Sequence, residues 1–152
     1  REESEPELLP LPLDGDEGQM VLLHSALAEA WSHEGDTPAV RRRVGVHRQT
    51  AGDDARALEP LDQALRGLHH RLPVAEVCSL ASRILRAAEA TGLRRGREWV
   101  HAALVLADAR WRSGDAAAAA IEERKFLIYF GISPNSPKGV WANWANWAIS
   151  AD

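Results

Sequence analysis

The chain has 152 residues, of which 45% are hydrophobic and 26% charged, a composition typical of an ordinary folded domain. No apolar run approaches the roughly 18 residues of a membrane-spanning helix, so no membrane span is expected. The single cysteine, Cys78, excludes an intramolecular disulfide. With no secretory signal, this predicts a cytoplasmic location. The net charge is −4, with seven acids and one arginine in residues 1–19 but twelve arginines and six acids in residues 37–97.

Residues 1–18 are expected to form an acidic, proline-rich, disordered lead-in. Pro6, Pro10 and Pro12 lie among acidic residues, and proline disfavours helix because it lacks an amide donor. The lead-in either stays solvated or folds over the more basic middle of the chain. The chain starts at Arg1 without a methionine, so one interpretation is a fragment or excised domain of a protein in which a partner domain could hold the chemistry; the sequence leaves this open.

Residues 19–130 show the spacing of apolar residues by three and four that predicts amphipathic helices. The helices are expected within residues 19–35, 37–52, 54–72, 74–92, 97–114 and 115–130. The stripes expected to face the core are Leu23, Ala26, Leu27, Ala30 and Trp31; Ala57, Leu58, Leu61, Ala64, Leu65 and Leu68; Val77, Leu80, Ala81, Ile84, Leu85 and Ala88; and Trp99, Val100, Ala103, Leu104, Ala107 and Trp111.

Glycine–aspartate pairs mark where one helix ends and the next begins. Each pair places a glycine that tolerates positive φ before an aspartate that caps a helix; the pairs are Gly35–Asp36, Gly52–Asp53 and Gly114–Asp115. The sequence Leu-Ala-Glu-Ala precedes the first pair, and Leu-Ala-Asp-Ala precedes the last, 79 residues further on. That offset corresponds to about two units of a helical repeat. The pattern predicts stacked antiparallel helical hairpins.

In its small residues before each turn, and in the alanine-rich stretch 116–120 after the last one, the chain resembles the tetratricopeptide (TPR) family of helical repeats. The resemblance covers about residues 20–130. It implies an all-α fold of antiparallel hairpins stacked as a short α-solenoid, with a concave face that binds a protein or peptide. A strict period and the family's Trp and Leu-Gly pattern are missing. Similar arrays occur in large bacterial signalling proteins, downstream of Ser/Thr kinase domains, although no kinase motif is present here.

The sequence shows no catalytic or metal-binding constellation, and we expect neither an enzyme nor a cofactor. The histidines lack the spacing of a helical metal site, and Glu98 with His101 lacks the second such pair that a di-iron bundle needs. Adjacent His69 and His70 point about 100° apart on a helix, so one is expected to be exposed and the other partly buried. Cys78 is interpreted as a small buried hydrophobe.

Two clusters of arginines are the candidate contacts for a partner. Arg42, Arg48, Arg94 and Arg97 are chosen from them, for acidic side chains or a C-terminal carboxylate of a bound peptide. A nucleic-acid-binding helical domain is an alternative, because clustered arginines also contact phosphates. The acidic net charge and the lack of nearby aromatic residues disfavour it, and no nucleic acid is expected. Trp99 and Trp111 are expected to lie in the core.

Residues 131–139 are rich in proline, glycine and serine and predict a linker to a Trp-rich segment, residues 140–152. Its candidate partner-binding residues are Trp141, Trp144 and Trp147. As a helix, this segment would pack on the last hairpin, which we favour, or be offered to a partner. Its tandem Trp-Ala-Asn is similar to the cores of peptides cyclised by radical-SAM enzymes. That resemblance implies an alternative role as the leader and core of a modification substrate.

Overall fold

The computed structural model describes residues 16–93, 96–121 and 124 of the chain. These residues contain five helices bounded at both ends, namely α1 (Glu17–Ser32), α2 (Pro38–Thr50), α3 (Asp54–Leu68), α4 (Val74–Ala90) and α5 (Arg97–Arg112). Residues 116–121 are helical again. Within these residues no strand is present, and the predicted all-α class is confirmed. The predicted linker and Trp-rich segment lie outside the described residues.

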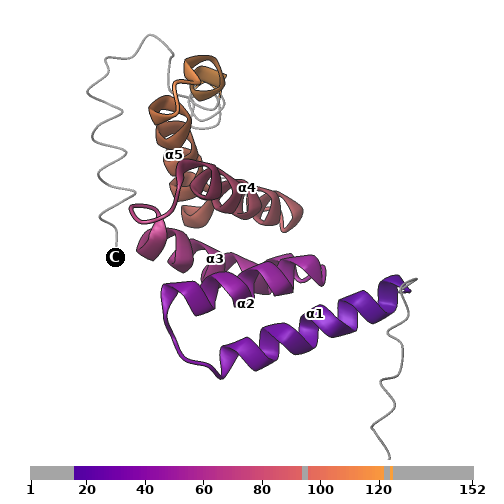
Figure 1. The fold of residues 1–152 in the computed structure, drawn as a ribbon. Coiled ribbons are helices and arrows are strands. Elements are labelled where there is room, and N and C mark those ends of the chain that lie inside the picture. The colour runs from indigo at the N-terminus through magenta and orange to yellow at the C-terminus, as the bar shows by residue number, and fades with distance from the viewer. Residues whose placement is uncertain (1–15, 94–95, 122–123, 125–152) are drawn as a thin grey trace, which may run out of the picture.

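Each helix packs against the next one along the chain, and Figure 1 shows α1 at one end of the resulting stack. In addition, α3 touches α5, one hairpin further on. The short turns between helices force neighbours to run antiparallel. The fold is therefore a short α-solenoid of stacked hairpins, as predicted, with α2/α3 and α4/α5 as its two complete hairpins.

The predicted stop-and-start signals are confirmed at two turns. Gly52 and Gly114 have φ of 83° and 80°, the left-handed region that favours glycine. The side chain of Asp53 then accepts a hydrogen bond from the Arg56 amide, and that of Asp115 accepts one from the Ala118 amide. The following helices therefore begin where the aspartates place them.

At the first turn the predicted cap is wrong by one residue. Thr37, not Asp36, caps α2, and its hydroxyl accepts a hydrogen bond from the Val40 amide at 3.3 Å. The reason is Pro38, which is the first helical residue and forces the residue before it into an extended conformation, the conformation of an N-cap. Asp36 instead forms an ion pair with Arg41.

The stripe predicted for α1 is largely wrong. Ala28 is the one residue of this helix that is fully buried, while Leu23, Ala26 and Ala30 are exposed and Trp31 is half-buried. The first half of α1 also leaves a run of large apolar side chains exposed: Met20, Val21, Leu22 and Leu23. The helix starts at Glu17, two residues before the predicted start, because the carboxylate of Asp16 caps it. α1 forms by local signals, and among the described helices it packs mainly on α2.

The core lies between α3, α4 and α5. The predicted stripes of α3 and α4 are buried apart from Leu68 and Leu85, which pack at the edge of the core. In α5 every residue from Trp99 to Leu106 is buried, so this helix is surrounded rather than amphipathic. Trp99 is a core residue as predicted, but Trp111 is 67% exposed. Trp111 lies in the last turn of α5, beyond the fully buried run that ends at Leu106.

Two details bring α2 and α3 unusually close. Gly45 faces Leu61, and a Cβ at Gly45 would lie 2.5 Å from the Leu61 Cγ. Pro60 lies inside α3 and has no amide to donate to the carbonyl of Arg56, four residues earlier. Arg48 of α2 donates its Nη1 to that carbonyl at 3.1 Å instead. The hairpin thus satisfies a backbone group that α3 alone leaves open.

Candidate functional site

A groove of about 470 Å³ opens between α2 and α4. It combines cationic groups with an apolar floor. The cationic and titratable residues that line it are Arg42, Arg43, His47 and Arg83, and the others are Ala39, Val46, Leu68, Leu72, Ser79 and Leu80. A concave surface of this kind, mostly apolar with a few placed polar groups, is typical of a binding site.

Helical spacing places these side chains on facing surfaces. In α2, Ala39, Arg43 and Val46 follow steps of four and three, so they share one face. In α4, Ser79 and Arg83 are four residues apart and lie on one face in the same way. Because α3 connects α2 to α4, the two helices run in the same direction and their groove-facing residues meet in register.

Two polar contacts between α2 and α4 fix the width of the groove. Arg42 Nη1 lies 2.8 Å from Glu76 Oε2. Two turns further along both helices, Gln49 Nε2 donates to the Arg83 carbonyl at 2.8 Å, and Arg83 Nη1 donates to Gln49 Oε1 at 3.1 Å. Arg83 is therefore held by a neutral amide, which leaves its charge uncompensated within this contact.

The three consecutive arginines of α2 do not form one patch. Arg41 pairs with Asp36, and this hydrogen bond lowers the pKa of the Asp36 carboxyl despite a small opposing effect of burial. Arg42 pairs with Glu76 across the groove, as described above. The guanidinium of Arg43 lies 4.1 Å from the ring centroid of Trp31, so it tethers α1 to α2 by a cation–π contact. Each arginine thus binds a different part of the fold.

His47 lies at the border between the groove and α1. Its Nδ1 is 2.9 Å from the Nδ1 of His24 on α1. Such a contact needs one protonated and one unprotonated nitrogen, so it is lost when both rings are doubly protonated. Burial, and then the proximity of His24, lower the pKa of His47 below its ordinary value.

The sequence-predicted contacts are only partly brought together. Arg42 lines the groove, whereas Arg48 binds the Arg56 carbonyl and Arg97, the first residue of α5, is exposed elsewhere. Arg94 and the three predicted tryptophans, Trp141, Trp144 and Trp147, lie outside the described residues. Sequence reasoning missed Arg83. No motif marks it, and only its place at the edge of the apolar stripe of α4 distinguishes it.

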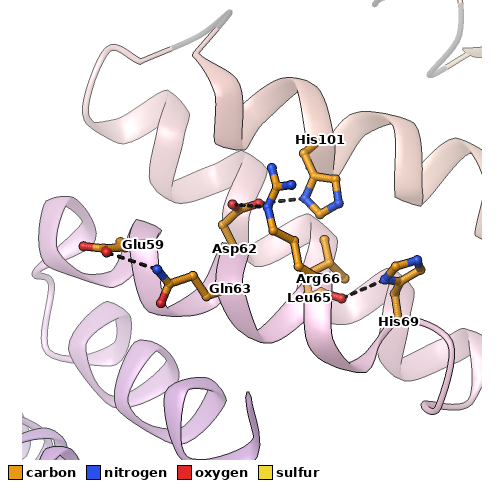
Figure 2. A network of polar contacts seen from close by, with 7 residues as sticks. All are labelled: Glu59, Asp62, Gln63, Leu65, Arg66, His69 and His101. Atoms are coloured by element: carbon orange, nitrogen blue, oxygen red, sulfur yellow. Dashed lines mark hydrogen bonds and ion pairs between the residues drawn. The ribbon is translucent and has the colours of Figure 1, made fainter. Parts of the chain in front are cut away.

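A second polar cluster is buried between α3 and α5, and Figure 2 shows it from close by. His101 Nδ1 lies 2.7 Å from one oxygen of Asp62, and Arg66 Nε lies 2.9 Å from the other. Burial opposes ionisation of Asp62, but the hydrogen bonds from His101 and Arg66 outweigh it and lower its pKa. The cluster joins two helices of the core, and its residues do not line the groove between α2 and α4.

The remaining candidates for chemistry do not converge. Among residues 16–93, 96–121 and 124, no three His, Cys, Asp or Glu side chains gather as a metal site would require. His70 is exposed and His69 half-buried, as predicted. Cys78 is half-buried and packs against the core, close to the predicted small hydrophobe.

The comparisons with known proteins add no relative: no protein-family model, curated protein or solved structure matches the chain. Over the part of the chain that the structure describes, no helix has both the length and the apolarity needed to cross a bilayer.

Proposed function

We propose that this chain is a non-catalytic, TPR-like protein-interaction module whose groove between α2 and α4 binds a peptide segment carrying leucine and acidic side chains. The observation that supports this proposal is the pairing of an apolar floor with guanidinium groups in one groove. Leucine side chains would bury apolar area against Val46, Leu72 and Leu80. Carboxylates would receive charge-assisted hydrogen bonds from the arginines.

The arginines differ in what they offer to such a peptide. Arg42 is already neutralised by Glu76, so its net contribution to binding is small. Arg83 is the strongest anchor, because Gln49 holds it in place without cancelling its charge. A side chain that is already ordered loses little conformational entropy on binding.

The disposition of the arginine triplet favours a peptide over nucleic acid. Phosphate-backbone binding relies on several free cations along one face. Here Arg41 and Arg42 are paired with carboxylates and Arg43 lies over Trp31. Within a larger bacterial signalling protein, such a module would recruit a partner by one of its acidic segments.

The test is fluorescence anisotropy with the full chain and a labelled synthetic peptide of about twelve leucine and glutamate residues. We expect micromolar binding, a loss of about tenfold or more in Arg83→Glu, and no binding of the same peptide with lysine in place of glutamate.

Arg86→Glu is the matched control, because Arg86 lies on the same helix, is exposed and does not line the groove. Thermal melts check that both variants are folded. An equal loss of affinity in the two variants would rule out the groove as the binding site. The same conclusion would follow if the peptide bound neither the unaltered chain nor a chain in which the glutamates of the lead-in, residues 1–18, are replaced by glutamine.

A further inference from the structure

We propose that the groove has an occupant within the chain, the acidic and leucine-rich segment of residues 2–14, which competes with partner peptides. This inference rests on the proposed function, since it assigns an occupant to the same groove. The segment lies outside the described residues, and its composition and its point of attachment carry the argument.

The composition of the segment complements the groove. Four glutamates come first and four leucines follow, separated by prolines: Glu2, Glu3, Glu5, Glu7, Leu8, Leu9, Leu11 and Leu13. The groove offers the opposite charge and an apolar floor. Prolines keep such a segment extended and reduce the entropy that it loses on docking.

The point of attachment puts the segment within reach. The described chain begins at Asp16, immediately before α1, and His24 of the same helix touches His47 of the groove. Eight residues of helix between Asp16 and His24 span about 12 Å. From His47 to Arg42 along α2 is about 8 Å more. An extended segment covers about 3 Å per residue, so the leucines reach the near end of the groove and the glutamates reach Arg42 and Arg43.

The charge order agrees with this path for two of the three arginines of the groove. A chain that leaves Asp16 and runs along α2 toward its beginning passes Arg83, which is bound to Gln49, then Val46, and then Arg42 and Arg43. The leucines are nearest to Asp16 and the glutamates are furthest from it. Residues 140–152 are a poorer fit, because they carry a single acidic side chain, Asp152.

The first test measures proximity in the full chain by paramagnetic relaxation. A nitroxide is attached at Ser4→Cys in a Cys78→Ala background, and the methyl signals of Val46, Leu72 and Leu80 are followed by NMR. We expect these signals to broaden, whereas those of Leu106 in α5 do not. Replacing the four glutamates by lysine should abolish the broadening, and raising the salt to about 0.5 M should weaken it.

A nitroxide at Ser150→Cys is the control for the other end of the chain. Broadening of the groove signals from that position alone would overturn the proposal in favour of the Trp-rich segment. No broadening from either position would overturn it outright.

The second test separates this inference from the proposed function. The labelled leucine–glutamate peptide is titrated into the full chain and into a variant with Glu2→Gln, Glu3→Gln, Glu5→Gln and Glu7→Gln. We expect about tenfold tighter binding to the variant, because a tethered occupant competes at high effective concentration. Equal binding to both would overturn the inference and leave the proposed function standing. If the peptide binds neither chain while the nitroxide at Ser4→Cys still broadens the groove signals, the proposed function is overturned. The groove then binds residues 2–14 of its own chain and no partner peptide.

Discussion

The first helix of the stack, α1, and the last helix that is bounded at both ends, α5, have similar lengths but very different surroundings. In α5 the residues from Trp99 to Leu106 are all buried, while in α1 Ala28 alone is. α1 is held by a histidine pair and by one cation–π contact, whereas α5 is held by the apolar core. In a stack where each helix touches mainly its neighbours, stability is local. The difference teaches that α1 is the weak end, and the groove borders it.

The largest expected effect tests the core side of this comparison. Leu61→Ala removes a fully buried side chain that α2 and α3 share, so it should lower the free energy of unfolding by about 2–5 kcal/mol. Leu22→Ala in α1, where the side chain is 72% exposed, should change it by less than about 0.5 kcal/mol. Urea denaturation measures both. A comparable loss of unfolding free energy in the two variants would contradict the difference in stability between the core and α1.

The next effect concerns the polar contact within the core. His101→Ala removes one of the two side chains that pair with the buried carboxylate of Asp62 and leaves it with Arg66, and should destabilise the fold by about 2–3 kcal/mol. The pKa of Asp62 is lowered in the folded state, so its ionised form stabilises the protein above about pH 4. That contribution is lost as the pH falls through the lower, folded-state pKa. Urea melts at pH 7 and pH 3 should therefore differ less in Asp62→Asn than in the unaltered chain.

A smaller effect compares the same substitution in two helices. Gly45→Ala should destabilise by about 1–3 kcal/mol, because its Cβ meets Leu61 and overpacking outweighs the gain in helix propensity. Gly18→Ala in α1 meets no atom closer than 3.6 Å and should be neutral or slightly stabilising. Thermal melts of the two variants decide this. A stabilising Gly45→Ala would show that α2 and α3 can separate at no cost.

The smallest effect is a pH dependence confined to α1. The pKa of His47 is lowered in the folded state, so the unfolded or undocked state binds protons first as the pH falls below about 6.5. Docking of α1 is therefore complete at neutral pH and weakens toward pH 5.5. Hydrogen exchange of the α1 amides, corrected for the intrinsic rate, should show this loss of protection. It should be smaller in His24→Ala, and α5 should be unaffected; equal loss in α5 would point to global unfolding instead.

The helices were predictable from the sequence because local signals define them. Apolar spacing, Gly52–Asp53 and Gly114–Asp115 each act within a few residues, and the structure follows them. The stripe of α3 was predictable for the same reason. Its apolar residues alternate with charged ones at a helical period, and they are buried.

The features that could not be predicted from the sequence are those that depend on where each helix lies in the stack. The apolar residues of α1 include the consecutive Met20 to Leu23, which point to all sides of the helix, whereas those of α4 gather on one face. Among the described helices α1 packs mainly on α2, while α4 packs on both α3 and α5. The groove is harder still to predict, because Arg83 and Arg43 lie forty residues apart and meet through the packing of α2 on α4. Trp111 shows the converse, since a large aromatic residue at a helical step still faces outward.

The arginine triplet has a consequence for how such an array evolves. Its three members reach Asp36 before the helix, Glu76 on the following hairpin and Trp31 on the preceding helix. A copy of α2 and α3 inserted elsewhere would find none of these three partners, and an insertion of one residue in α2 would rotate all three away together. This hairpin is thus fitted to its place in the order, and a duplicate of it alone would lose these three contacts.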